Sequence, residues 1–342
     1  MATSMQSSPD PAITTASSQA STPSILAQFS MLDMELLHHW TTVTVQASID
    51  FLTGIELYRT TVIRFAFEYP FVMHQLLALT AIHISYLRPN KQSTYRHAAD
   101  SHAAMALSLF RTEIGNLTTE NCHACFSFST TIFMYAWASQ ELDKPSTLIF
   151  KPSSTYQSAD IQWVKLHRGT NTILTTWWPV LENGPCHCLF VPWKDLDPNG
   201  PDPLLLDDEK HLTSLRGSWK DLPDQQRQIL DTNLKITRRA LSRVDFIPGS
   251  SRLAAGISWF SQISDEFIQM LAEKVPEALL IVCYYCVVLE KLSDTWWMKG
   301  KAENLLRTVL TELGEGWDTW TRWPMDRVLG ETGVVPGLLY QT

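Results

Sequence analysis

The chain has 342 residues, of which 45% are hydrophobic and 18% charged, so it holds enough apolar material for a large core. Its formal net charge of −8 at pH 7 argues against broad electrostatic attraction to nucleic acid, which requires a basic face. The sequence contains no uninterrupted apolar stretch of about 18 residues, so no membrane span is expected.

The first 30 residues differ in composition from the rest of the chain. They are rich in Ser, Thr, Ala and Pro and contain neither Lys nor Arg. Because they lack a basic start and an apolar run, we expect a disordered leader on an intracellular protein rather than a signal peptide. Residues 31–330 are then predicted to form one helical domain, and residues 331–342 a C-terminal tail.

Helical patterns follow one another along the predicted domain. Asp33 is suited to cap the first helix, Pro70 to begin the third, and Pro179 to end the sixth. The fifth helix is apolar nearly all round, which favours a central, buried position. The predicted helices are residues 34–47, 56–67, 70–87, 91–114, 119–139, 159–178, 223–244, 265–272, 276–293 and 301–313, with a last short helix in 314–330 that ends at Pro324 and Gly330.

Alternating strand patterns and internal repeats are absent from the sequence. Residues 140–158 and 184–203 contain Pro, Gly and Ser and are predicted to be loops. The expected fold is therefore all-α, with a single helical bundle.

Five segments of the predicted domain occur in an order that points to a known family. They are MELLHHWTT from Met34, PFVMHQLLALTAIHISYL from Pro70, KLHRGTNTIL from Lys165, YYCVVLEKLSDTWWMKG from Tyr284 and WDTWTRWPMDRVLG from Trp317. Together, between Met31 and Gly330, they resemble the C-terminal effector half of fungal zinc-cluster transcription factors of the sterol uptake control type.

This resemblance implies an all-α domain with an internal apolar pocket for a sterol or a similar lipid. In such regulators the occupancy of the pocket controls whether the attached zinc cluster acts on promoters. The zinc cluster and its basic linker have no counterpart in this sequence, where the Ser- and Thr-rich leader stands instead. Direct DNA binding is therefore not expected, and a gene model that lacks an upstream zinc-cluster exon is left open.

The six cysteines do not form a zinc cluster in sequence. They lie at Cys122, Cys125, Cys186, Cys188, Cys283 and Cys286, spread over more than half the chain among Phe, Tyr, Val and Leu. A cluster needs its thiolates close enough to share metal ions, whereas CHAC and CYYC stand in apolar helical runs. We predict buried thiols and no metal site; a zinc site assembled with His123 or His187 is the less favoured alternative.

The thirteen tryptophans are the strongest signal from the residues themselves. Large rings fill cores, and they also line apolar pockets in which an indole N–H orients a polar group. The fifth helix and the 276–293 helix are expected to face one another. The predicted ligand-binding residues are Phe133, Met134, Tyr135, Trp137, Tyr284, Tyr285, Trp296 and Trp297. The alternative for each is a place in an ordinary hydrophobic core.

Catalytic motifs are not legible in the sequence. GxGxxG, Walker and GxSxG patterns are absent, so no cofactor is expected. The run Asp207, Asp208 and Glu209 lacks the further carboxylate of a terpene cyclase metal site and favours the start of a helix. Catalytic residues therefore stay unknown. If the pocket is catalytic, the first acid–base candidates are His38, His39, His74 and His83.

Two functions from different classes fit these observations. The favoured one is a ligand-binding regulator of fungal lipid, sterol or secondary metabolism, which acts on transcription in the nucleus, the cytoplasm or both. Its expected partners are an apolar small molecule (a sterol, terpenoid or polyketide) and a DNA-binding protein, with a homodimer left open. The alternative is a cofactor-independent cyclase or isomerase of a natural-product pathway, in which aromatic faces stabilise developing positive charge.

Overall fold

The computed structural model describes residues 30–49, 52–146, 162–190, 204–246 and 250–330. Every regular element in these ranges is a helix, which confirms the predicted all-α class. The predicted leader and tail, and most of the two predicted loops, lie outside the described residues.

The described helices fall into an earlier and a later set along the chain. The earlier set is α1 (Met31–His39), η2 (Trp40–Thr44), α2 (Val45–Ser48), α3 (Leu52–Glu56), η3 (Leu57–Thr61), α4 (Val62–Glu68), α5 (Pro70–Leu87), η4 (Pro89–Lys91), α6 (Gln92–Ile114) and α7 (Cys122–Ala138). The later set is α8 (Gln162–Glu182), η5 (His187–Leu189), α10 (Leu206–Ser214), η6 (Leu215–Trp219), α11 (Asp224–Phe246), α12 (Ser250–Ile257), α13 (Trp259–Gln262), α14 (Asp265–Ala272), α15 (Pro276–Glu290), α16 (Lys301–Leu313) and α17 (Asp318–Leu329).

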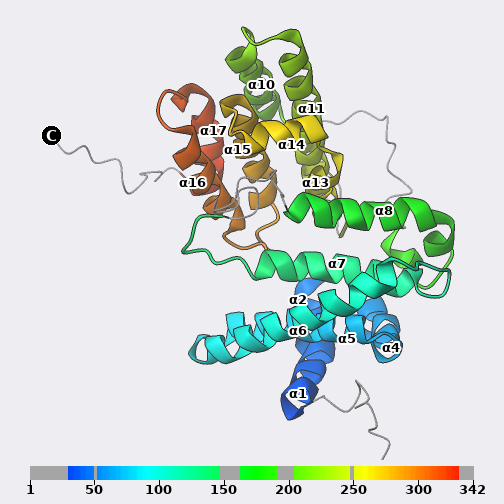
Figure 1. The fold of residues 1–342 in the computed structure, drawn as a ribbon. Helices are drawn as coiled ribbons and strands as arrows, with labels where there is room; N and C mark the ends of the chain where they lie inside the picture. The colour runs from blue at the N-terminus through cyan, green and yellow to red at the C-terminus, as the bar shows by residue number, and fades with distance from the viewer. Residues whose placement is uncertain (1–29, 50–51, 147–161, 191–203, 247–249, 331–342) are drawn as a thin grey trace, which may run out of the picture.

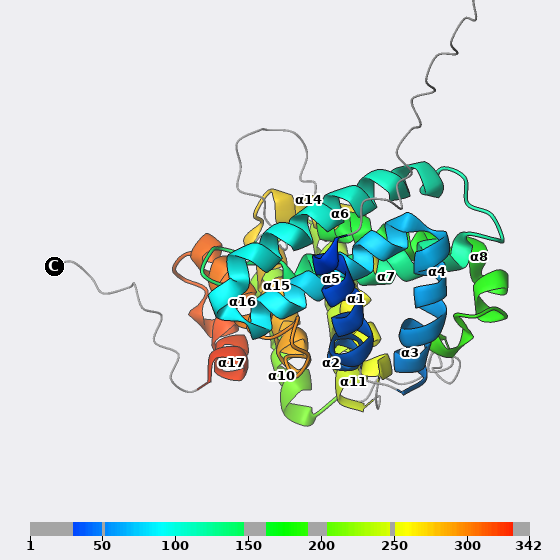
Figure 2. The same ribbon diagram turned by 90° about the horizontal axis from the view of Figure 1, so that it is seen from below.

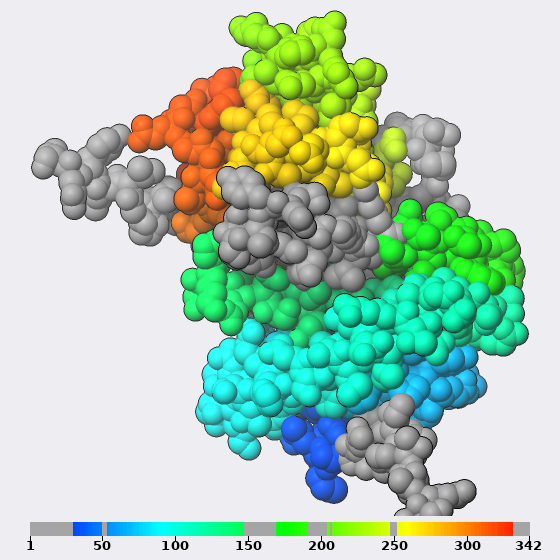
Figure 3. All heavy atoms as spheres, viewed as in Figure 1, coloured from blue at the N-terminus to red at the C-terminus, as the bar shows by residue number. Residues whose placement is uncertain are grey.

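In space the helices form two groups that meet at α7 and α8. Helices α1 to α6 lie below α7 in Figure 1, and α10 to α17 lie above α8. Figure 3 shows the same division on the surface, where α6 crosses the front of the lower group and α14 lies in the upper group. Helix α7 packs on α5 and α8, and α8 packs in turn on α13. The pair α7 and α8 therefore connects the two groups.

The first helix begins earlier than its sequence pattern predicted. Ser30, not Asp33, is the N-cap, and Asp33 is the third helical residue. The Asp33 backbone N–H donates to Ser30 Oγ at 3.3 Å, and the Ser30 backbone N–H donates to Asp33 Oδ2 at 2.6 Å. This reciprocal capping box satisfies two backbone donors that a helix N-terminus otherwise leaves open.

Helix α5 is the core of the lower group. Pro70 occupies its first turn, where the missing N–H costs nothing, so the helix has the bounds that the sequence predicted. Its length and apolar composition would suit a membrane span, but 78% of the segment is buried inside the protein. Figure 2 shows α5 among α1, α6 and α7, and it packs against all three. We therefore interpret α5 as a core helix.

Helix α15 has the same place in the upper group. It packs against α11, α16 and α17, and its residues from Ala278 to Leu289 are buried on every face. A helix that is apolar all round needs neighbours on all sides, which the surrounding helices supply. The predicted helix 276–293 thus ends three residues earlier, at Glu290.

Two prolines that were predicted to end helices lie inside the elements α8 and α17. Helix α8 continues past Pro179 to Glu182, with a non-helical backbone at Trp177, two residues before the proline. Helix α17 likewise contains Pro324 and ends only at Leu329. A proline removes one hydrogen bond and bends a helix, so α8 is kinked at Trp177, close to its predicted end, whereas α17 passes Pro324 and is capped by Gly330 as predicted.

Candidate functional site

An aromatic cluster joins α7 to the upper group. Phe133 and Trp137 lie one turn apart on α7, with ring centroids 5.7 Å apart. Phe133 meets the edge of Trp297 at 6.0 Å, and Trp137 meets Phe260 of α13 at 5.8 Å. Phe260 then contacts Tyr285 of α15 at 5.4 Å. The structure therefore brings four of the eight predicted ligand-binding residues into one cluster.

Helices α7 and α15 are linked by these rings, through α13 and the segment after α15. Phe260 is the member that the sequence analysis missed. It lies in a four-residue helix whose pattern is too short to distinguish from a loop. The cluster is fully enclosed, since its five rings are all less than 5% exposed.

The other four predicted residues have different neighbours. The Tyr135 hydroxyl donates to Asp100 Oδ1 of α6 at 2.8 Å. Tyr284 lies 5.0 Å from the Trp323 ring of α17. Met134 is 9% exposed on α7. Tyr135 and Tyr284 therefore contact different helices rather than one shared space.

Trp296 packs against the lower group. Its ring stacks on His83 of α5 at 4.5 Å, and its Nε1 donates to Ser48 Oγ at 3.1 Å. Its neighbour Trp297 enters the aromatic cluster instead. The two adjacent tryptophans therefore anchor the segment after α15 to two places, Trp296 to α5 of the lower group and Trp297 to α7.

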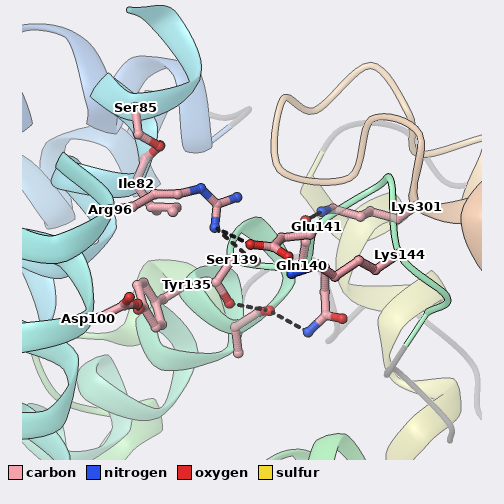
Figure 4. Close-up of polar contacts among 11 residues, drawn as sticks. Ile82, Ser85, Arg96, Asp100, Tyr135, Ser139, Gln140, Glu141, Lys144 and Lys301 are labelled. Carbon is pink, nitrogen blue, oxygen red and sulfur yellow. Dashed lines mark hydrogen bonds and ion pairs between the residues drawn. The ribbon is translucent and has the colours of Figure 1, made fainter. Parts of the chain in front are cut away.

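A polar cluster lies at the C-terminal end of α7, beside Tyr135. We call it the Arg96–Lys301 cluster, and its members are Arg96, Asp100, Tyr135, Ser139, Gln140, Glu141, Lys144 and Lys301 (Figure 4). They come from α6, from the end of α7 and the chain that follows it, and from the first residue of α16. The cluster therefore stands where the two groups of helices meet.

Two cations bind carbonyl groups at the C-terminal end of α7, one on Ser139, which caps the helix, and one on the next residue, Gln140. Arg96 Nη1 donates to the Ser139 carbonyl at 3.4 Å, and Lys301 Nζ donates to the Gln140 carbonyl at 2.6 Å. Carbonyl groups at a helix C-terminus have no partner within the helix and carry partial negative charge. Both cations are therefore placed where a helix end attracts them.

Lys301 is the least expected member of the cluster. Only 4% of it is exposed, and burial, followed by the nearby charge of Arg96, lowers the pKa of its ammonium to about 8. Nothing in the sequence marked this lysine, because the pattern of α16 resembles that of any amphipathic surface helix. Its burial depends on chain segments that lie more than 150 positions apart.

The histidines that were considered for acid–base chemistry fall into two separate places. His39 and His83 each place Nδ1 at 3.0 Å from Thr44 Oγ1, while His38 is exposed. Burial is the main cause that lowers the pKa of His83, to about 4, and lowers that of His39. These rings are therefore neutral at pH 7.

His74 belongs to the second place. Its Nδ1 lies 2.9 Å from Nδ1 of His102, whose Nε2 lies 2.9 Å from Asp33 Oδ1. Burial and His102 lower the pKa of His74 to about 4. This chain of groups ties α5 and α6 to the capping box of α1, and no nucleophile takes part in it.

All six cysteines are free thiols, and five are buried. Burial raises the pKa of Cys125 and of Cys186 to about 12, so neither is a thiolate at neutral pH. In the part of the chain that the structure describes, no three His, Cys, Asp or Glu side chains gather in a way that could hold a metal ion.

A surface hollow of about 490 Å³ lies beside the α15–α16 connection and α17. Its lining is Glu290, Ser293, Asp294, Lys299, Gly300, Glu303 and Val328. It includes none of the eight predicted ligand-binding residues, and its carboxylates suit an apolar ligand poorly.

Comparison with known proteins gives a match to one protein-family model. Residues 35–184 match the family model of the fungal specific transcription factor domain. These residues run from the middle of α1 to the end of α8, so they include most of the lower group and all of α7.

Three relatives extend the likeness along most of the chain. A Zn(2)-C6 fungal-type transcription factor of Gibberella zeae is 21% identical over 326 residues, covering 91% of this chain and 65% of the relative. Sterol uptake control protein 2 of Saccharomyces cerevisiae is 28% identical over 84% of this chain and 31% of its own length. Its namesake in Candida albicans is 23% identical over 83% of this chain and 41% of its own length.

These matches confirm the predicted resemblance. The chain is similar to the effector region of these fungal transcription factors, two of which are sterol uptake control proteins. It spans 65% or less of the length of each of these relatives.

Proposed function

We propose that this chain binds an apolar small molecule that carries one polar group, and that occupancy regulates transcription through a DNA-binding protein partner. The ligand classes in view are sterols, terpenoids and polyketides of lipid or secondary metabolism. The proposed place of action is the nucleus, reached from the cytoplasm.

The observation that carries the proposal is the position of two clusters on a single helix. The aromatic cluster and the Arg96–Lys301 cluster both include residues of α7, at the junction of the two helical groups. Rings supply apolar contact, and the polar cluster supplies hydrogen bonds for one end of a ligand. A ligand held between them would favour one packing of the groups over another, which is the requirement for a switch.

The first experiment asks what the protein binds. The purified chain is incubated with a fungal lipid extract and analysed by native mass spectrometry, and one bound lipid per chain is expected. Phe133→Leu in the aromatic cluster should reduce the bound fraction. Phe71→Leu is the matched control, since Phe71 is an equally buried ring of α5 that packs on Phe110 and Phe128 instead. Absence of any bound lipid, or equal losses in both variants, would contradict the proposal.

The second experiment asks whether binding matters for transcription. The chain is fused to a heterologous DNA-binding domain, and reporter output is measured in fungal cells before and after depletion of their sterols. Output that changes on depletion in the wild type, but not in Phe133→Leu, supports a ligand-dependent regulator. Reporter output that changes neither on sterol depletion nor in Phe133→Leu argues against a ligand-dependent regulator.

A further inference from the structure

Two cations converge on the end of α7 from opposite sides. Arg96 reaches it from α6 and Lys301 from the first residue of α16, and their side chains point toward one another (Figure 4). Arg96 donates to the carbonyl of Ser139, the C-cap of α7, and Lys301 donates to the carbonyl of Gln140, the residue after it. Ile82 and Ser85 of α5 lie beside Arg96 in the same view.

The carboxylates of the cluster do not balance these cations. Glu141 forms its closest ion pair with Lys144, and its distance to Arg96 Nη1 is 3.9 Å. Asp100 accepts the hydrogen bond of the Tyr135 hydroxyl. Three cations therefore face two carboxylates, and among the described residues none forms an ion pair with Lys301.

Burying the Lys301 ammonium group costs free energy, because a buried charge loses its contact with water. An ammonium group has three donors, and the Gln140 carbonyl is the acceptor of one, although Lys301 is only 4% exposed. Lys301 also stands at the N-terminus of α16, where the helix dipole is positive. The helix dipole places about half a negative charge at the C-terminus of α7, whereas two full positive charges lie beside it. A structural cap alone would need only one of them.

We infer that Arg96 and Lys301 together hold the carboxylate of the ligand, so that the ligand is an amphipathic acid rather than a neutral sterol. This inference rests on the proposed function and names the chemistry of its ligand. A carboxylate between a guanidinium and an ammonium forms charge-assisted hydrogen bonds and uses the open donors of Lys301. The apolar part would extend along α7 toward Phe133 and Trp137 of the aromatic cluster.

The cluster also offers a way in from solvent. The Arg96 side chain is 30% exposed and that of Glu141 41%, whereas Lys301 lies inside. An acid that enters here meets Arg96 first and Lys301 last. The lowered pKa of Lys301 fits the same arrangement, because a buried cation beside a second cation gains from a counter-ion.

The test compares acids with alcohols of the same skeleton. Hexadecanoic acid and abietic acid represent a fatty acid and a terpenoid acid, and hexadecanol and abietinol are their neutral partners. Affinities are measured for the wild type and for Lys301→Met, Arg96→Met and Lys299→Met. Lys299 is the control, because it is an exposed cation two positions from Lys301 in the same segment. The melting temperature of each variant is recorded.

We expect the wild type and Lys299→Met to prefer an acid over its alcohol by about tenfold or more, as hydrogen bonds to charged groups allow. Lys301→Met and Arg96→Met should lose that preference and keep their affinity for the alcohol. If hexadecanoic acid binds more tightly than abietic acid, the ligand is a fatty acid; the reverse order indicates a terpenoid acid. Removing the Lys301 charge should not lower the melting temperature, since an uncompensated buried cation is removed.

Three outcomes would overturn the inference. An alcohol bound as tightly as its acid by the wild type would leave the proposed function intact but assign a neutral ligand. If the preference for an acid survives in Lys301→Met, or is lost equally in Lys299→Met, then Arg96 and Lys301 only cap the C-terminus of α7 and do not bind the ligand. If the wild type binds none of the four probes and nothing from a lipid extract, both the inference and the ligand-binding function are rejected.

Discussion

Trp297 buries its whole ring against Phe133, while its Nε1 has no hydrogen-bond acceptor among the described residues. Trp297→Ala should therefore lower the free energy of unfolding by about 3–5 kcal/mol, the usual cost of emptying such a site. Trp297→Phe should cost much less, because the lost N–H makes no hydrogen bond. Urea unfolding of both variants measures the difference.

The control is Trp317→Ala in the upper group. Trp317 is partly exposed and contacts Trp320, so its removal should cost roughly 1 kcal/mol or less. Equal losses at Trp297 and Trp317 would show that Trp297 does not join the two groups.

His83 should make the protein sensitive to acid. Its pKa is about 4 in the folded chain, against an ordinary value near 6.5 in the unfolded one, so folding favours the neutral ring. The stability from this group is fully present above about pH 6.5 and is lost as the pH falls toward 4. The loss amounts to about 3 kcal/mol at most, and His74 acts in the same direction.

His83→Gln should flatten the pH dependence of the unfolding free energy between pH 6.5 and 4. His97→Gln, at an exposed position of α6, should leave the curve of the wild type unchanged. A slope that persists in His83→Gln would assign the acid sensitivity to other groups.

For single residues, the sequence predicted which side chains are buried, but not which distant side chains they contact. The apolar run of α7 correctly indicated that Phe133 and Trp137 are buried. Their contacts with Phe260 and Trp297 depend on how distant segments cross, which no local period encodes. Lys301 was missed for the same reason.

Helix bounds were predicted best where backbone chemistry fixes them. Helix α16 runs from Lys301 to Leu313 as expected, because Gly300 and Gly314 flank it with φ of 75° and 69°. Such values suit glycine, which has no Cβ. The π-helical turns at Trp40–Thr44 and Leu57–Thr61 were not predicted, since the hydrophobic period changes too little over five residues.

One close approach between elements can be tested directly. A Cβ on Gly184, after α8, would lie 2.3 Å from the ring of His123 on α7. Gly184→Ala should therefore cost about 1–3 kcal/mol through overpacking. Adding His123→Ala should recover part of that loss, so a double-mutant cycle by urea unfolding measures the coupling.

Gly217→Ala serves as the comparison, because a Cβ at Gly217 meets nothing within 4 Å. It should be neutral or slightly stabilising. An equal cost in both glycine variants, or no rescue by His123→Ala, would show that contact with His123 is not what requires a glycine at 184.

For the molecule as a whole, the all-α class followed from the sequence, whereas the junction between the groups did not. Local periodicity predicts helices, but the packing of α16 against the segment that follows α7 depends on contacts across the chain. The Ser146 backbone N–H, for example, donates to Thr308 Oγ1 across 162 positions.

The predicted leader gives a further test at this scale. Removing residues 1–29 should leave the melting temperature nearly unchanged, because their composition offers little to bury. Removing Ser30 as well should cost about 1 kcal/mol, since the capping box of α1 is lost. Ser30→Ala in the full chain is the control and should show the same loss. A large fall from the first deletion would mean that the leader packs on the domain.

The contact between Trp296 and Ser48 joins residues 248 positions apart. A nascent chain leaves the ribosome from its N-terminus, so the lower group is complete long before Trp296 emerges. Until then the face of α5 around His83 lacks its covering ring. During translation that face of α5 therefore stays uncovered until the segment after α15 has been synthesised.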